Sequence, residues 1–181
     1  ADNGTSMTQS EARVPKHNGI AERYVRTIKD GARTLLHQCG LDGRWATQAI
    51  QHYLFIWNRM YVSQHTKVTP YQTYFKIEPS VNTVGVFGCD VYAWIHKDNR
   101  DAGTFAPRGE PAVYLGHDAE QNCPVVHLLK SGKIQRVRSV SYRNDQFNFG
   151  RALIKGADAI QRVIADTDKS DSSAWTHSID I

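Results

Sequence analysis

The sequence predicts an α+β fold, with helices in the first half of the chain and antiparallel strands in the second. Between about residues 17 and 79, apolar residues recur every three or four positions, which is the period of amphipathic helices. From about residue 83 to 148 the apolar residues instead form short runs separated by turn sequences, as in a small antiparallel sheet or barrel. This order of elements favours two units over one doubly wound sheet.

The composition is that of a chain with a hydrophobic core. Of the 181 residues, 40% are hydrophobic and 10% aromatic, which excludes global disorder. No run approaches the ~18 apolar residues of a membrane-spanning helix, and no signal peptide opens the chain, so we expect no membrane insertion. We place the protein inside the cell, in the nucleus or an organelle. The net charge of +4 is compatible with a nucleic-acid partner.

Three cysteines, Cys39, Cys89 and Cys123, are widely spaced and include no CxxC pair. This pattern supports neither a zinc knuckle nor a disulfide framework. We expect reduced and partly buried thiols, as in an intracellular protein.

Residues 1–16 are polar and irregular, and the first helix is predicted to follow them and run to Cys39. Asn18 is the expected N-cap, and Gly40 is the expected stop. One face of this helix carries an apolar stripe, made of Ile20, Tyr24, Ile28, Ala32, Leu35 and Cys39. The opposite face carries a row of three basic residues, Arg26, Lys29 and Arg33. One acid, Glu22, lies on the same face near the start of the helix.

A second helix is predicted from about Arg44 to Met60, and apolar residues cover much of its circumference. Such a helix is buried on more than one side, so we expect His52 to be a hydrogen-bonded core or boundary residue. Thr69, Pro70 and Gln72 have the spacing of a capping box that starts a short third helix.

The strand region begins after Pro79. Strands are predicted at Val91–Ile95 and Pro111–Leu115, and a hairpin is predicted with its turn at Lys130–Lys133. A last helix, Ala152–Ile164, precedes a flexible Asp- and Ser-rich tail. We therefore divide the chain into an irregular segment (1–16), a helical part (17–79), a β-barrel domain (80–149), and a C-terminal helix and tail (150–181).

One segment carries the most specific pattern, Pro15-Lys16-His17-Asn18-Gly19-Ile20-Ala21-Glu22-Arg23. It resembles the signature around the last catalytic Glu of copia-type retrotransposon integrases. Four later blocks match that family in the same order, namely Thr27–Leu36 with Gly40-Leu41, Thr69-Pro70-Tyr71, Val86–Tyr92, and Pro107-Arg108-Gly109 with Ala112–His117. Five blocks in order over residues 15–145 make coincidence a poor explanation.

The resemblance implies a ribonuclease-H-like core followed by a small barrel similar to a Src-homology-3 domain. In this family two Asp and one Glu hold two divalent metals, Mg²⁺ or Mn²⁺, for transfer of DNA strands. Glu22 matches the third carboxylate. Arg23, Arg26, Lys29 and Arg33 then become candidates for contacts with phosphates.

The carboxylate set is incomplete in this sequence. Ala1–Met7 resembles a worn copy of the motif that holds the second Asp, so Asp2 is its only candidate. Only 19 residues separate Asp2 from Glu22, too few for the family's intervening strand and helix. The first Asp and the zinc-binding region have no counterpart. Because one carboxylate cannot organise two metals, we expect no catalysis and no cofactor in the chain as given, and a metal at Glu22 only where upstream carboxylates are supplied.

Two explanations remain open. The chain is either the C-terminal portion of a longer integrase, linked to DNA integration, or a domesticated, non-enzymatic structural or RNA-binding subunit of a large assembly. In both, the expected partners are DNA or RNA and further protein subunits. A second candidate nucleic-acid surface is the stretch without acids formed by Lys130, Lys133, Arg136, Arg138 and Arg143, which can equally be a strand edge guarded by charges.

Overall fold

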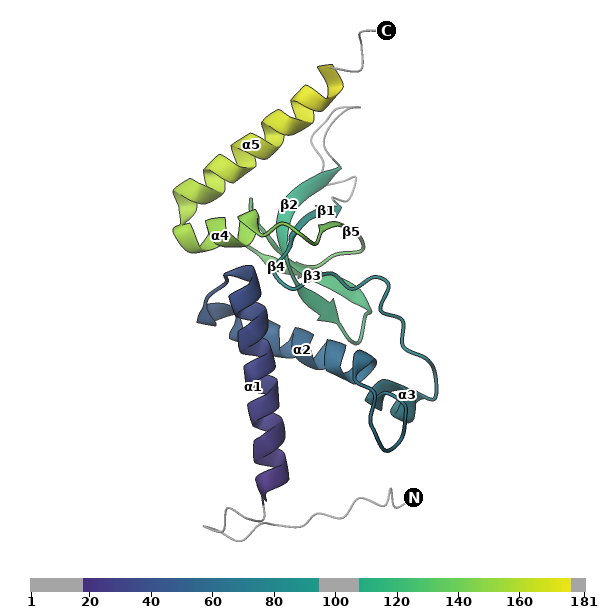
Figure 1. Cartoon of the computed structure of the whole chain (residues 1–181). Helices are drawn as coiled ribbons and strands as arrows, with labels where there is room; N and C mark the ends of the chain where they lie inside the picture. The colour runs from purple at the N-terminus through teal and green to yellow at the C-terminus, as the bar shows by residue number, and fades with distance from the viewer. Residues whose placement is uncertain (1–17, 95–107, 177–181) are drawn as a thin grey trace.

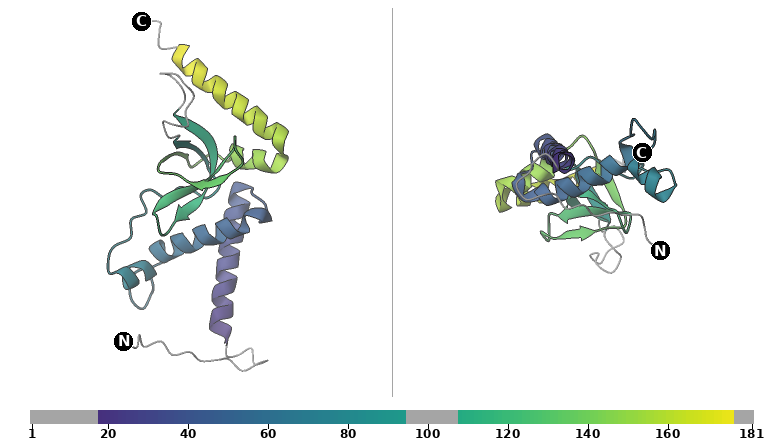
Figure 2. Two further views of the ribbon diagram at one scale, coloured as in Figure 1. Left: turned by 180° about the vertical axis from the view of Figure 1, so that it is seen from behind. Right: turned by 90° about the horizontal axis from the view of Figure 1, so that it is seen from below.

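The computed structural model describes residues 18–94 and 108–176 and confirms the α+β class. Its first part is helical: α1 (Gly19–Cys39), the 3₁₀ turn η2 (Gly43–Trp45), α2 (Ala46–Met60) and α3 (Pro70–Phe75). Helix α1 packs across α2 through its C-terminal half, and its N-terminal end extends away from the sheet, as Figures 1 and 2 show. At the crossing the helices are very close, because a Cβ at Gly31 would overlap the ring of Tyr53.

The helix ends follow the predicted chemistry in two of three places. Gly40 ends α1 with φ at 73°, a left-handed conformation that glycine adopts without strain. Thr69 caps α3, since its side chain accepts a hydrogen bond from the Gln72 amide, and Pro70 is the first helical residue. Asn18 precedes α1 as predicted, but its side chain makes no capping hydrogen bond.

Five antiparallel strands form one sheet: β1 (Asp90–Trp94), β2 (Gly109–Asp118), β3 (Cys123–Leu128), β4 (Ile134–Arg136) and β5 (Val140–Arg143). Their spatial order is β4-β3-β2-β1-β5. The predicted hairpin is confirmed, because β3 pairs with β4 across the turn that contains Gly132. Between Tyr114 and Gly116 the β2–β3 register shifts by a bulge, and Gly116 there has φ at 130°.

The closed barrel predicted from the sequence is not observed. Within the described residues β4 and β5 are the two edges of an open sheet, and neither pairs with the other. Closure requires the first and last strands to tilt and hydrogen-bond. The two edge strands are short, because β4 has three residues and β5 has four. They offer few backbone groups for such bonds, and they stay at opposite edges with three strands between them.

The C-terminal part contains two helices, α4 (Asn148–Lys155) and α5 (Ala157–Thr176), separated at Gly156. Gly156 has φ at 100°, which explains why one continuous helix does not form. Residues 166–173, for which a flexible tail was predicted, belong to α5, and their flexibility stays a prediction. Helix α5 runs away from the sheet at the opposite end from α1 (Figure 1).

One hydrophobic cluster joins the helices to the sheet. Its buried members come from α1, α2, strand β2 and α4, among them Ala32, Ala49, Leu115 and Phe149. The proposed boundary between residues 79 and 80 stays a prediction about folding units, and the two sides share this core. The three cysteines are free thiols, with Cys39 and Cys89 fully buried. No helix in the described ranges is long and apolar enough to cross a bilayer.

Candidate nucleic-acid interface

The first candidate interface is the polar face of α1, which we call the α1 cationic face and define by Arg26, Lys29 and Arg33. All three side chains are exposed. They share a shallow hollow of about 380 Å³ with Glu22. The spacing read from the sequence therefore brings these four residues to one side of the helix, as expected for positions separated by three or four residues.

The position of α1 in the fold leaves this face accessible. Only the C-terminal half of α1 packs on the body, through Ala32 and Cys39. Every residue from 18 to 26 is exposed, including Arg23, because the helix extends past α2 (Figure 2). Within the described residues, the α1 cationic face is therefore left uncovered.

Ion pairing leaves most of this charge uncompensated. Arg33 is paired with Asp30, since its Nη1 lies 2.8 Å from Oδ1 of that residue. Among the described residues Glu22 and Arg26 make no ion pair, although their spacing permits one. Two cations of this part of the chain, Arg26 and Lys29, therefore stand on α1 without an acidic partner.

The described residues do not complete a metal centre around Glu22. No group of three or more His, Cys, Asp or Glu side chains in these ranges is arranged to hold a metal ion. Asp30 is the other acid beside the hollow, and its carboxylate is bonded to Arg33. Asp2 lies outside the described residues. Glu22 alone offers too few oxygen ligands for Mg²⁺ or Mn²⁺.

The second candidate surface is divided by the sheet. Lys130 and Lys133 are exposed at the turn between β3 and β4, on one side of the sheet order. Arg143 lies on β5 at the opposite edge, where it pairs in register with Asp90 of β1. Arg138 is exposed on the segment between β4 and β5. The five basic residues therefore do not form a single row.

Arg136, the remaining member, is exposed but forms an ion pair within the protein. Its Nε donates to Oδ2 of Asp118 at 2.6 Å, and Asp118 also accepts bonds from the Glu120 and Gln121 amides. These bonds hold the pKa of the Asp118 carboxyl below its usual range. The ion pair connects β4 to the end of β2, on the far side of β3.

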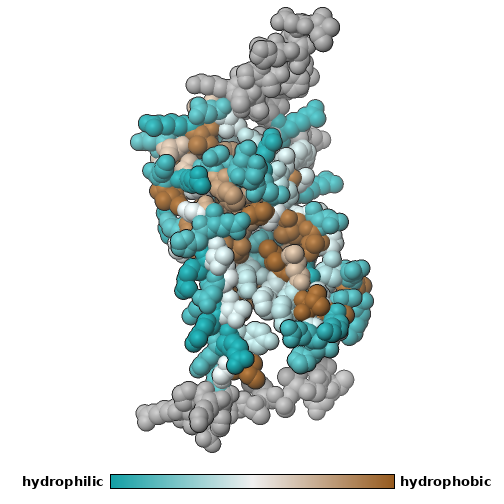
Figure 3. Space-filling model, viewed as in Figure 1, coloured by the Kyte–Doolittle hydropathy of each residue, from teal (hydrophilic) through white to brown (hydrophobic). Residues whose placement is uncertain are grey.

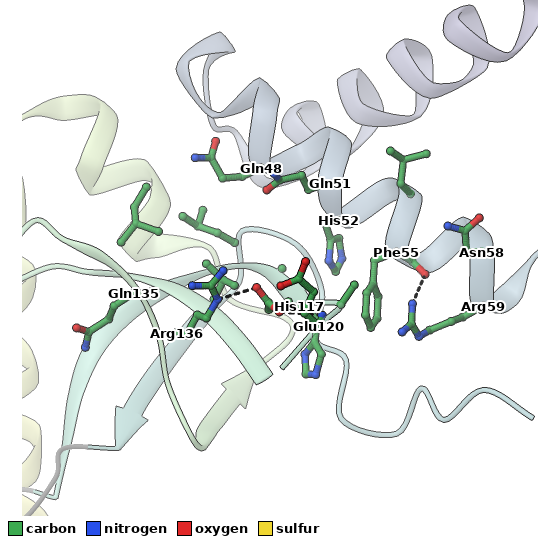
Figure 4. A pocket seen from close by; sticks show the side chains of 17 residues that line it. Gln48, Gln51, His52, Phe55, Asn58, Arg59, His117, Glu120, Gln135 and Arg136 are labelled. Carbon is green, nitrogen blue, oxygen red and sulfur yellow. Dashed lines mark hydrogen bonds and ion pairs between the residues drawn. The ribbon is translucent and has the colours of Figure 1, made fainter. Parts of the chain in front are cut away.

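A cleft that the sequence did not predict lies between α2 and the ends of β2 and β4 (Figure 4). It has a volume of about 620 Å³. His52 of α2 and His117 of β2 line it, and they are 1% and 7% exposed. The predicted hydrogen bond of His52 is absent, because neither ring nitrogen has a partner among the described residues. Instead the ring packs between Phe87 and Tyr114, with centroid distances of 5.5 and 5.6 Å.

Burial determines the charge state of this histidine pair. Burial lowers the pKa of His52 to about 4, with a smaller contribution from repulsion by His117. Burial also lowers the pKa of His117, and the nearby Arg59 adds to that effect. Both rings are therefore neutral near pH 7. The signal for this pair was available only in part, because position 52 reads as buried but its neighbour is 65 positions away in the sequence.

The surface of the molecule is otherwise mixed in character. Figure 3 shows hydrophilic residues over most of the visible face, with apolar patches among them near the helices and the sheet. Charged side chains are therefore available on several elements, and the α1 cationic face is distinguished by its projection from the body.

Comparisons with known proteins point to retroelements. The chain is 25% identical over 153 residues to the "Retrovirus-related Pol polyprotein from transposon RE1" of Arabidopsis thaliana, a match that covers 84% of this chain and 10% of that protein. It is 24% identical over 149 residues to the transposon RE2 polyprotein of the same plant, covering 82% of this chain and 10% of the relative. A third relative is the transposon TNT 1-94 polyprotein of Nicotiana tabacum, with 26% identity over 133 residues, 74% of this chain and 10% of the relative.

The chain spans about a tenth of the length of these polyproteins. No protein-family model matches it, and no solved structure matches it. The resemblance to copia-type elements seen in the sequence motifs is thus supported at the level of Pol polyproteins. We conclude that the chain is similar, over most of its length, to a segment of retrotransposon Pol polyproteins.

Proposed function

We propose that this chain is a retroelement-derived segment that binds nucleic acid through the α1 cationic face. In this proposal α1, α2 and α3 correspond to the end of a ribonuclease-H-like integrase core, and the five-stranded sheet corresponds to its C-terminal β domain. The similarity to Pol polyproteins supports the retroelement origin. The observation that carries the binding function is the pair of exposed cations Arg26 and Lys29, which have no acidic partner among the described residues, on a projecting helix.

The physical basis is neutralisation of phosphates. Each Lys or Arg that approaches a phosphate releases a condensed counterion, so binding weakens as salt rises. Backbone contacts of this kind position a duplex without reading its sequence. Lys130 and Lys133 at the β3–β4 turn are a second group of exposed cations that supports the same function. Arg136 is a weaker candidate for this role, because its Nε is bonded to Asp118.

Strand transfer is a separate question from binding. Glu22 is placed on the α1 cationic face, where a third metal-binding carboxylate would also lie beside DNA. The only further acid that the described residues place there is Asp30, which is bonded to Arg33, and no group of three possible metal ligands forms in these ranges. We therefore expect catalysis only when a segment bearing two Asp is provided, together with Mg²⁺ or Mn²⁺.

Fluorescence anisotropy with labelled duplex DNA and duplex RNA tests the proposal. We expect the logarithm of the association constant to fall linearly with the logarithm of the salt concentration between about 50 and 200 mM. Lys29→Gln should reduce the steepness of that line by about one and weaken binding. Arg162→Gln, which removes an exposed cation of α5, is the matched control and should leave both quantities unchanged.

Two results would contradict the proposal. One is the absence of salt-dependent binding by the folded chain, and the other is an equal effect of Lys29→Gln and Arg162→Gln. The choice of duplex separates the two origins left open by the sequence. Preference for DNA favours an integrase segment, whereas preference for RNA favours a domesticated subunit.

A further inference from the structure

Exposed apolar side chains are concentrated at the helical end of the molecule. Nine of the twelve large hydrophobic side chains that are exposed in the described residues come from α1, the end of α2 with the two residues after it, and the α3 region. Ile20 on α1 is 76% exposed, and Tyr74 on α3 is 80% exposed. A concentration of this kind on one part of a surface is typical of a protein interaction site.

Between these helices lies a groove of about 860 Å³, which we call the α1–α3 groove. Tyr24 and Ile28 line it from α1, Trp57 and Tyr61 from α2 and the residue after it, and Tyr74 from α3. In Figure 1 α1 and α3 lie toward opposite ends of α2, at the end of the molecule opposite α5. The apolar stripe of α1 thus continues past the part that packs on the core and forms one wall of the groove.

The aromatic side chains of the groove are held by one another. Trp57 and Tyr61 are stacked, with ring centroids 4.3 Å apart and planes 10° from parallel. Tyr53 continues the row on α2, with its centroid 5.8 Å from that of Trp57. Aromatic rings fixed in this way lose little conformational entropy when a partner covers them, and such residues are frequent hot spots of protein interfaces.

The charges around the groove indicate the character of its occupant. From residue 43 to residue 78 the chain contains four cations, Arg44, Arg59, Lys67 and Lys76, and one acid, Glu78. Lys67 and Lys76 are exposed and lie within two residues of groove-lining positions. A partner with acidic residues at its rim would complement them, whereas a second copy of this chain would bring like charges together.

We propose that the α1–α3 groove is a docking site for another polypeptide segment of a Pol-type protein, one with an apolar centre and an acidic rim. This inference rests on the proposed retroelement origin and not on nucleic-acid binding by α1. The relatives are about ten times as long as the matched region, so they contain further segments that can supply such a surface. Exposed aliphatic side chains at this end of the molecule, Ile20 on α1 and Ile77 after α3, suit a protein surface better than a nucleic acid.

The test uses the segment of the transposon RE1 polyprotein that directly precedes its matched region, produced as a separate polypeptide of about 150 residues. Its binding to the full 181-residue chain is measured by calorimetry. We expect binding that weakens at least tenfold in the double variant Tyr24→Asp, Tyr74→Asp. Both side chains are more than half exposed, so this variant should fold, which circular dichroism checks. Ile154→Asp, at an exposed apolar position of α4, is the control and should bind normally.

Each other outcome overturns the proposal. The segment either fails to bind the folded chain, or binds the double variant as tightly as the parent. If analytical ultracentrifugation shows that the parent chain is a dimer and the double variant is a monomer, the groove binds a second copy of the chain. Nucleic-acid binding that is lost in the double variant, and kept in Lys29→Gln, assigns it to nucleic acid. Failure of the α1 proposal is recognised separately, because it concerns Lys29 and not the groove.

Discussion

Asp90 on β1 caps helix α4, because its Oδ1 accepts a hydrogen bond from the backbone amide of Phe149 at 2.8 Å. Its Oδ2 accepts a second bond from the Asn148 amide at 3.0 Å. Helix α4 has no side-chain cap from its own N-cap residue, Phe147. A strand residue 58 positions away thus satisfies amides that a helix normally leaves unpaired. This pair of bonds connects the sheet to the C-terminal helices.

Removing the Asp90 carboxylate should destabilise the protein strongly. Asp90 is 1% exposed, so Asp90→Ala leaves buried amides without partners and should lower the free energy of unfolding by about 2–3 kcal/mol. Asp90→Asn retains one acceptor oxygen and should lose less. Asp145→Ala removes an exposed acid nearby and is the control. Urea denaturation measures all three variants, and equal stability of Asp90→Ala and Asp145→Ala would disprove the capping role.

Gly88 is the second position where the fold depends on one residue. It has φ at 77°, and a Cβ there would overlap Cβ and Sγ of Cys39 in α1. Gly88→Ala should therefore lower the free energy of unfolding by about 2–4 kcal/mol, through backbone strain and overpacking. Gly43→Ala is the matched control, because a Cβ at that position meets nothing within 4 Å. The control should change stability by less than about 0.5 kcal/mol.

Acidification should weaken the packing of α2 on β2. The pKa of His52 is about 4 in the folded protein and 6.5 when it is unperturbed, so the unfolded chain binds the extra proton first. The neutral His52 ring therefore costs the folded protein no stability above pH 6.5. As the pH falls from 6.5 to 4, the free energy of unfolding decreases, because the unfolded chain gains the proton on His52 first. The shift corresponds to about 3 kcal/mol at most for His52. The lowered pKa of His117 acts in the same direction.

Urea denaturation of the His52→Leu variant at several pH values checks this assignment. The variant should have a flatter dependence on pH than the parent, even if its stability at pH 7 differs. His65→Leu, at an exposed histidine after α2, should keep the parent's dependence. An unchanged dependence in His52→Leu would mean that other groups cause the acid sensitivity.

Glu22 offers a test of charge against metal chemistry on α1. If nucleic acid lies along the α1 cationic face, Glu22→Gln removes a like charge beside the phosphates and should tighten binding a few-fold at low salt. The measurement is anisotropy with and without Mg²⁺. Weaker binding by the variant, seen only with Mg²⁺, would instead show that the carboxylate acts through a metal.

Local sequence signals predicted the helices well. The stripe from Ile20 to Cys39, the glycine stop at Gly40 and the cap at Thr69 all depend on neighbours within one helical turn, and the structure confirms them. The hairpin between β3 and β4 was predictable for the same reason. The helical backbone at 166–173 was missed, because an Asp- and Ser-rich composition indicates flexibility but does not exclude a helix.

Non-local features were outside the reach of the sequence. The basic stretch from Lys130 to Arg143 looks continuous in one dimension, yet the strand order sends its ends to opposite edges of an open sheet. The pairing of Arg136 with Asp118 removed a cation that the sequence counted as free. The His52–His117 cleft depends on the bulge at Gly116, which lets α2 approach β2 closely.

The sequence by itself determined the α+β class, the positions of most helices and strands, and the similarity to copia-type Pol proteins, because these follow from periodicity, turn chemistry and motifs. Only the tertiary structure decided which charges stand free, which histidines are buried together, and that the sheet stays open. Those properties depend on contacts between residues far apart in the chain. Burial and ion pairing are set by such contacts, so in the described part of the chain Arg26 on α1 has no acidic partner, whereas Arg136 on β4 is paired with Asp118.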